Sequence, residues 1–201
     1  MTTTSSPVAP PGVSNAAPTP ALPLGAGQWT LDPAHSSVNF AVRHLGLTNV
    51  RGRFGRFDAT LDVGESIDDV EVTAEVDMAS VDTSNPDRDA HLRSTDFFDT
   101  AAHPTLTFRS TAVQGTGTDY SLTGELTING VTRPVTLEVE FAGTDVFPGD
   151  QTTHAGFAAT TTIRRSDYGI DFGLALGGDK VMLGDKIKVE LDIQFVAPAG
   201  S

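Results

Sequence analysis

The five histidines are the side chains of this sequence best suited to metal binding or proton transfer, and they lie far apart along the chain. They are His35, His44, His91, His103 and His154. No two of them have the His-x₃-His spacing, or a similar one, that places two metal ligands together. The sequence also contains no cysteine, which excludes disulfides, thiol catalysis and cysteine-ligated zinc or iron–sulfur sites. The sequence therefore predicts no metal site.

Two short runs contain residue types used in catalysis, but neither has the arrangement that catalysis requires. Asp32, His35 and Ser36 are the residue types of a hydrolase triad, yet side chains so close on one strand cannot converge as nucleophile, base and orienting group. The run 171–173, Asp-Phe-Gly, matches a protein-kinase motif, but the sequence lacks the Gly-rich loop and the catalytic loop that give the motif its function. We therefore expect no catalytic residues and no enzyme.

The run Arg88-Asp89-x-His91 is the remaining candidate, and it lies in the one segment that predicts a helix. Asn85 or the serine before it can cap this helix, and Pro86 suits its first position, where a missing N–H costs nothing. In one interpretation Arg88 or His91 contacts the head group of a ligand. In the other, Arg88 and Asp89 hold the helix against the rest of the fold and His91 forms a hydrogen bond nearby. We favour the second.

Length and composition limit the fold and its partners. The 201 residues favour a single domain, and the net charge of −13 with a pI near 4.5 argues against binding to nucleic acid or to an anionic membrane surface. Residues 1–27 carry no charged side chain and are rich in Pro, Ala, Thr and Ser, so we expect them to be disordered. They lack the basic start and unbroken apolar stretch of a secretory signal, and no run approaches the ~20 apolar residues of a membrane span. We therefore expect a cytoplasmic protein.

Apolar and polar residues alternate over most of the remaining chain, which is typical of half-buried β-strands. Eight or nine such strands are joined by short turns, including Asn129-Gly130, a strong hairpin signal. The pattern fits both a β-sandwich and a closed up-and-down barrel; we favour the barrel because closure removes the edges that long strands would expose. The expected fold class is all-β, an eight-stranded antiparallel barrel with one short helical insert.

The apolar faces of these strands contain many small residues among large ones. An eight-stranded barrel is just wide enough to be filled by side chains or to hold one small ligand. The small residues favour a cavity for an elongated apolar molecule, although the same alternation also fits the taper of a filled barrel. These small residues are Gly52, Ala59, Ala74, Ser110, Ala112, Gly124, Ala155 and Ala159.

Several long motifs follow one another along the chain: LDPAHSSVNFAVRHLGLTNVRGRFGRFDATLDV, SVDTSNPDRDAHLRSTDFFDTAAHPTLTFRST, LTGELTINGVTRPVTLEVEF and IRRSDYGI. Together they resemble the YceI-like family of polyisoprenoid-binding proteins. The resemblance implies a lipocalin-like barrel over residues 28–197, followed by a C-terminal tail at 198–201. It also implies a bound isoprenoid lipid or prenyl quinone in place of any other cofactor, a homodimer, and roles in lipid transport and the stress response. Many members are exported to the periplasm, whereas this sequence shows no export signal.

Carried over to this chain, the resemblance assigns lipid contact to large apolar residues of the barrel and of the helical insert. We expect the ligand-binding residues to be Phe40, Val42, Phe54, Val76, Phe97, Phe98, Phe108, Leu126, Phe141 and Phe157. The favoured function is non-catalytic carriage or sequestration of this lipid. Two alternatives remain: an enzyme that acts on the lipid, with His44, His91 or Asp89 as general acid or base, and a dimeric interaction module without a ligand.

Overall fold

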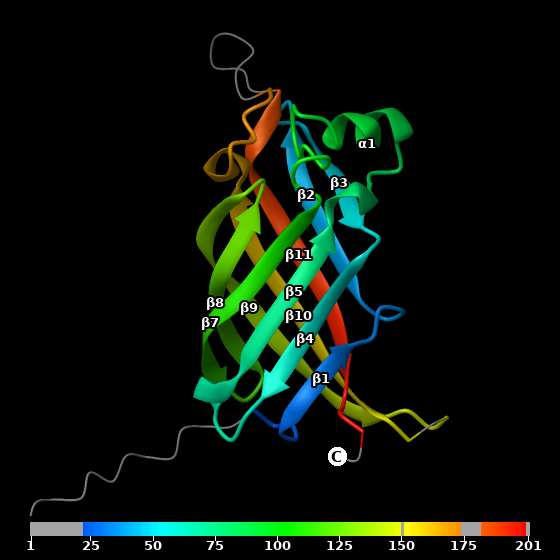
Figure 1. Cartoon of the computed structure of the whole chain (residues 1–201), viewed down its shortest axis with the longest axis vertical. Helices are drawn as coiled ribbons and strands as arrows, with labels where there is room; N and C mark the ends of the chain where they lie inside the picture. The colour runs from blue at the N-terminus through cyan, green and yellow to red at the C-terminus, as the bar shows by residue number, and fades with distance from the viewer. Residues whose placement is uncertain (1–21, 150, 174–181, 200–201) are drawn as a thin grey trace, which may run out of the picture.

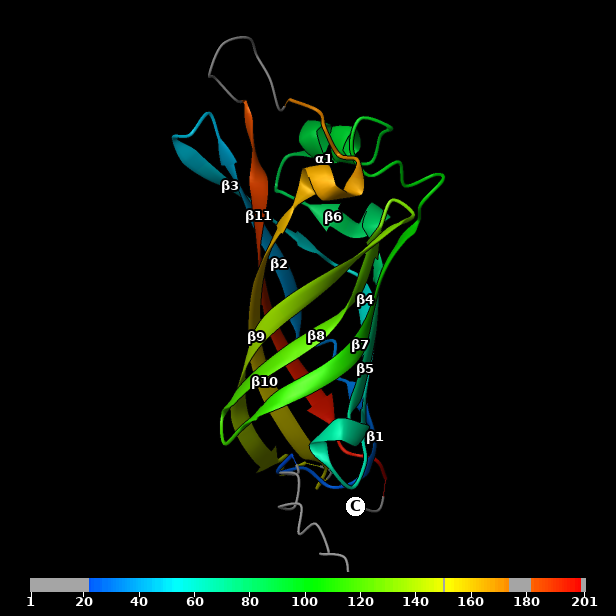
Figure 2. The same ribbon diagram turned by 90° about the vertical axis from the view of Figure 1, so that its left-hand side faces the viewer.

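The structure, a computed structural model, describes residues 22–149, 151–173 and 182–199, and these form a β-barrel (Figures 1 and 2). Neighbouring strands pair in the order β1-β4-β5-β7-β8-β9-β10-β11-β2-β3-β6, and every pair is antiparallel. The strands are β1 (Gly27–Leu31), β2 (Ser37–His44), β3 (Thr48–Phe54), β4 (Phe57–Val63), β5 (Glu71–Asp77), β6 (Val81–Asp82), β7 (Thr105–Thr116), β8 (Asp119–Ile128), β9 (Val131–Val146), β10 (Thr153–Arg164) and β11 (Leu183–Val196).

Strand β1 closes the barrel because it pairs on both of its sides. Trp29 lies opposite Leu61 of β4, and Leu31 lies opposite Phe195 of β11. The closed ring therefore contains eight strands: β1, β4, β5, β7, β8, β9, β10 and β11. Strand β11 is long enough to pair with β2 as well, and β2, β3 and the short β6 extend the wall at one end. The predicted eight-stranded antiparallel barrel is confirmed.

A helical insert covers the end of the barrel that β2, β3 and β6 extend, called the helix end below (Figures 1 and 2). Helix α1 (Pro86–Leu92) begins after Asn85, whose side chain accepts a hydrogen bond from the backbone N–H of Arg88. Pro86 is the first residue of the helix, as predicted. A 3₁₀ turn at Arg165–Tyr168 lies at the same end. No helix of the described residues is long and apolar enough to cross a membrane.

The hairpin between β8 and β9 has the predicted two-residue turn. Asn129 and Gly130 have φ angles of 51° and 73°, the left-handed values that a type I′ turn requires. Strand β7 differs from the prediction. Its pairing with β8 shifts between Ser110 and Ala112, and this bulge turns Ala112 outward and buries Val113 instead. One extra residue reverses the alternation of faces beyond it, which the apolar pattern did not reveal.

The opposite end of the barrel, called the base below, contains β1, the 3₁₀ turn Ile67–Asp69 and the last described residues of the chain (Figure 1). Here the predicted disorder does not extend through residues 22–27. Leu22 is buried in the barrel, Leu24 packs beside it, and β1 already begins at Gly27. Residues 1–21 of that prediction, and residues 200–201 of the expected tail, lie outside the described residues.

Candidate functional site

The interior of the barrel holds a cavity of about 290 Å³ that is lined almost wholly by carbon atoms. It extends from Leu22 at the base to Phe97 and Ile170 at the helix end, between two clusters of buried apolar side chains. The inward rows of the strands form its wall, for example Ile187, Val189, Leu191, Ile193 and Phe195 of β11. A cavity of this size and chemistry lies at the lower end of the range of roughly 300–1,000 Å³ that small-molecule sites occupy.

Most of the predicted ligand-binding residues come together around this cavity. The nine that line it are Phe40, Val42, Phe54, Val76, Phe97, Phe98, Phe108, Leu126 and Phe157. Phe141 does not line the cavity; it is buried at the base behind Phe157, with the two ring centroids 5.2 Å apart. Phe141 therefore supports the wall and does not face the space within it.

Only some of the predicted small residues create this space. Ala59, Ala74 and Ala159 line the cavity. The glycines do not, because aromatic rings cover them: a Cβ on Gly52 would lie within 2.8 Å of the Phe40 ring. Gly124 is covered in the same way by Phe108 of the neighbouring strand. The remaining small residues, Ser110, Ala112 and Ala155, also lie outside the lining.

Aromatic rings contact one another at the helix end of the cavity. Phe54 stands between Phe40 and Phe98, with centroid distances of 5.5 and 6.1 Å. Phe97, from the segment after α1, contacts Phe172 at 5.0 Å, and the His91 ring lies edge-on to both. These contacts join the helical insert to the chain that follows the 3₁₀ turn Arg165–Tyr168.

Arg165 is the one buried charged side chain among the described residues that line the cavity. Only 3% of it is exposed, and its guanidinium group donates to four backbone carbonyls at 2.7–3.0 Å. These carbonyls belong to Ile170, Phe172, Leu183 and Gly184. Arg165 thus ties the chain on both sides of residues 174–181 to the helix end of the barrel.

No carboxylate forms an ion pair with Arg165 among the described residues. Burial lowers the pKa of its guanidinium group, and the more distant charges of Asp185 and Asp171 partly offset this effect. An arginine nonetheless stays protonated in proteins, so the helix end carries a buried positive charge. Sequence reasoning missed this residue; its only signal was its place in the motif IRRSDYGI.

The Arg88-Asp89-x-His91 run holds α1 in place, and none of its three side chains lines the cavity. Arg88 donates to the hydroxyl and the carbonyl oxygen of Thr83 at 2.7 and 2.8 Å. One carboxylate oxygen of the buried Asp89 accepts hydrogen bonds from the backbone N–H and the hydroxyl of the same Thr83. His91 Nε2 lies 2.8 Å from a carboxylate oxygen of Asp96. The favoured structural interpretation of this run is confirmed.

Asp32, His35 and Ser36 do not form the hydrogen-bonded chain of a catalytic triad. Asp32 bonds to His35 at 2.8 Å, while the hydroxyl of Ser36 interacts with the backbone of Gln194 and not with His35. In the described part of the chain, no group of three or more His, Asp or Glu side chains is placed to hold a metal ion. What the interior can do chemically is to enclose an apolar molecule.

A family model described as the YceI-like domain matches residues 29–195, from β1 to the end of β11. The chain belongs to the YceI-like family. A UPF0312 protein of Staphylococcus aureus is 38% identical to this YceI-like chain over 169 residues, which are 83% of this chain and 96% of the relative.

Solved structures show the same barrel. The YCEI protein of Campylobacter jejuni is 27% identical, with a TM-score of 0.66 over 78% of this chain and 90% of that one. A polyisoprenoid binding domain from Saccharophagus degradans, described as implicated in plant cell wall breakdown, is 18% identical, with a TM-score of 0.63 over 85% of this chain and 98% of that one. This second likeness is one of fold.

Proposed function

We propose that this YceI-like protein binds an isoprenoid lipid or prenyl quinone inside its barrel and carries or sequesters it without changing it chemically. The observation that carries this proposal is the cavity of about 290 Å³ with an almost wholly apolar lining. A prenyl tail is long, unbranched apart from methyl groups, and apolar, and so it matches a tube of phenylalanine and aliphatic side chains. The name of the Saccharophagus degradans fold neighbour agrees with this ligand class.

Burial of apolar surface is sufficient to hold such a ligand. Enclosing ~400 Å² of prenyl surface at ~25 cal/mol/Å² contributes roughly 10 kcal/mol before the costs of association. Such binding requires no charged contact to the tail. This agrees with the described lining, which is apolar along its length and has its one buried charged residue, Arg165, at the helix end.

The positions of the candidate acids and bases support a non-catalytic role. His44, His91 and Asp89 were the residues expected to act on a lipid if the protein were an enzyme. None of them lines the cavity, and Asp89 and His91 are engaged with Thr83 and Asp96. A general acid or base must lie within hydrogen-bond distance of the atom that it protonates or deprotonates.

A filled cavity tests the proposal. Ala159 of β10 lines the cavity, and Ala159→Phe places a ring inside it. The matched control is Ala158→Phe, because Ala158 is the preceding residue on the same strand and does not line the cavity. Each protein is expressed, purified and extracted with organic solvent, and the extract is analysed by mass spectrometry. We expect wild type and Ala158→Phe to yield a prenyl lipid in similar amounts and Ala159→Phe to yield at least about tenfold less.

Two results would contradict this function. One is a purified wild-type protein that contains no prenyl lipid and takes up neither prenyl quinones nor polyprenyl phosphates. The other is recovery of a bound lipid in chemically altered form after incubation with the protein, which would favour the enzyme.

A further inference from the structure

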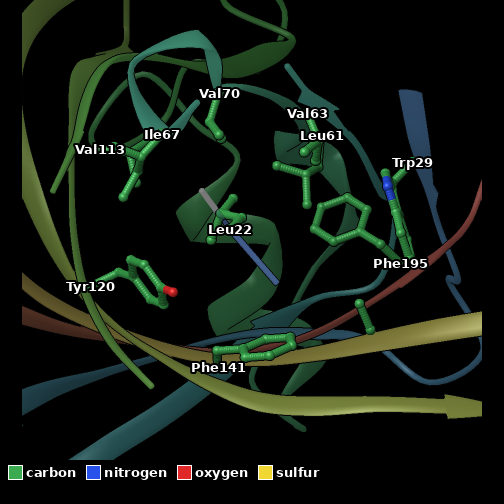
Figure 3. Close-up of a cluster of buried hydrophobic side chains, with 11 residues drawn as sticks. Leu22, Trp29, Leu61, Val63, Ile67, Val70, Val113, Tyr120, Phe141 and Phe195 are labelled. Atoms are coloured by element: carbon green, nitrogen blue, oxygen red, sulfur yellow. The ribbon is translucent and has the colours of Figure 1, made fainter. Parts of the chain in front are cut away.

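The side chain of Leu22 lies at the base of the cavity, before the first strand of the barrel. Leu22 precedes β1, is 8% exposed and lines the cavity. Figure 3 shows it in the middle of a ring of apolar side chains from both walls of the barrel. The labelled members of this ring are Trp29, Leu61, Val63, Ile67, Val70, Val113, Tyr120, Phe141 and Phe195. Leu22 therefore packs among the apolar side chains at this end of the barrel and faces the cavity.

The segment that carries Leu22 is fixed to the barrel. The indole N–H of Trp29 donates to the carbonyl oxygen of Gly25 at 2.9 Å, and Trp29 is itself 2% exposed in the wall of β1. Leu24 packs against the same apolar cluster but does not line the cavity. Two contacts on the side toward β1 thus hold the chain where Leu22 enters the barrel.

The two ends of the cavity differ in charge. The base is formed by apolar side chains such as Leu22, Val70 and Phe195, whereas the buried guanidinium group of Arg165 lies at the helix end. The lining exposes almost no polar atoms at either end, so this buried positive charge is what favours an amphipathic lipid whose polar head lies toward the helix end. The end of its apolar tail then lies toward the base, against Leu22.

We propose that Leu22 sets the length of the tail that this protein accepts, an inference that rests on the proposed lipid-binding function. A tail that is too long has to displace Leu22 from its buried position, and a tail that is too short leaves a gap above it. Both changes reduce burial of apolar surface, so affinity is highest at one length. Leu22 is in this sense a specificity-determining residue.

Two substitutions in the full chain test this inference in opposite directions. Leu22→Ala removes three carbon atoms and lengthens the cavity at the base, whereas Leu22→Phe enlarges the side chain and shortens it. The matched control is Leu24→Ala, which makes the same change in the same segment outside the lining. Each protein is equilibrated with an equimolar mixture of ubiquinones that differ only in the number of isoprene units. The bound homologues are then extracted and quantified, and urea unfolding verifies that each variant is folded.

We expect Leu22→Ala to favour longer homologues and Leu22→Phe to favour shorter ones, with Leu24→Ala unchanged from wild type. Each additional buried methylene raises affinity about fourfold, so filling the three vacated carbon positions changes the ratio of adjacent homologues by up to about sixtyfold.

The outcomes separate this inference from the proposed function. If wild type binds prenyl quinones but all four proteins have the same length profile, Leu22 does not set the length and the inference is wrong. The same conclusion holds if Leu22→Ala weakens binding of every homologue equally, because that result indicates a purely structural role. If wild type binds no homologue of any length, the proposed function fails and this inference fails with it.

Discussion

Replacement of Asp89 by alanine should destabilise the protein strongly, although Asp89 does not line the cavity. Asp89 is 7% exposed, and its carboxylate accepts two hydrogen bonds from Thr83, one from the backbone N–H at 2.9 Å and one from the hydroxyl. Thr83 is itself 6% exposed, so both donors lose their partner in a site without ready access to water. Each unsatisfied buried donor costs about 1–3 kcal/mol. The expected loss for the two donors is therefore about 2–6 kcal/mol of the roughly 5–15 kcal/mol that stabilises a typical domain.

Urea unfolding at pH 7, followed by circular dichroism, measures this loss. The control is Asp87→Ala, since Asp87 lies exposed in the first turn of the same helix, where a carboxylate contributes less than about 1 kcal/mol. In the folded fraction of Asp89→Ala we expect ligand affinity close to that of wild type. Equal stability of Asp89→Ala and Asp87→Ala would refute the assignment of Asp89 as the anchor of α1. Normal stability combined with lost ligand binding would show instead that Asp89 contacts the ligand.

Three further predictions concern Arg165, Asp77 and the oligomeric state. Arg165→Met leaves four backbone carbonyls without their donor and should lower the free energy of unfolding by at least about 3 kcal/mol in urea titrations; a loss below about 1 kcal/mol would contradict this role. The hydrogen bond from Arg56 lowers the pKa of Asp77, so its contribution to stability is fully present above the ordinary pKa near 3.9 and is lost as the pH falls below it. The stability difference between wild type and Asp77→Asn should thus be constant from pH 7 to pH 5 and shrink by pH 3, and a constant difference at pH 3 would exclude this contribution. The homodimer stays a prediction, which light scattering of the purified protein tests.

Local signals in the sequence were sufficient for the helix and for the tight hairpin turn. Asn85 and Pro86 specify the start of α1 through backbone groups within one turn, and Asn129-Gly130 specifies a type I′ turn through its own φ angles. The closed barrel was also predictable, since most of its strands are long and alternate apolar with polar residues. These features depend on neighbours in sequence, or on the general need to cover strand edges.

Two features that sequence reasoning missed, the bulge in β7 and the burial of Leu22, depend on contacts between distant segments. The bulge in β7 changes which side chains face inward. The sequence does not indicate this bulge, because Ser110, Ala112 and Val113 are each compatible with either face of a strand. Leu22 lies in a Pro- and Ala-rich segment whose composition predicts disorder. It is buried because side chains from distant strands, including Phe195 near the end of β11, form an apolar surface at the base against which Leu22 packs.

The location of the cavity follows from which residues face each other across strands, and not from the number of small residues. Gly52 lies directly opposite Phe40 in the β2–β3 hairpin, so the ring fills the space that the glycine leaves. Ala59 lies directly opposite Ala74, and two small side chains facing each other leave the space open. In a hairpin with a short turn, the turn fixes which residues face each other, so the Phe40–Gly52 pair could have been predicted from the sequence. Strands β4 and β5 are joined by a longer connection that contains the turn Ile67–Asp69. The register of this pair, and so the facing alanines, could not be predicted from the sequence and is seen only in the structure. A count of small inward residues therefore overestimates the space inside a barrel unless each residue is weighed together with its partner across the strand.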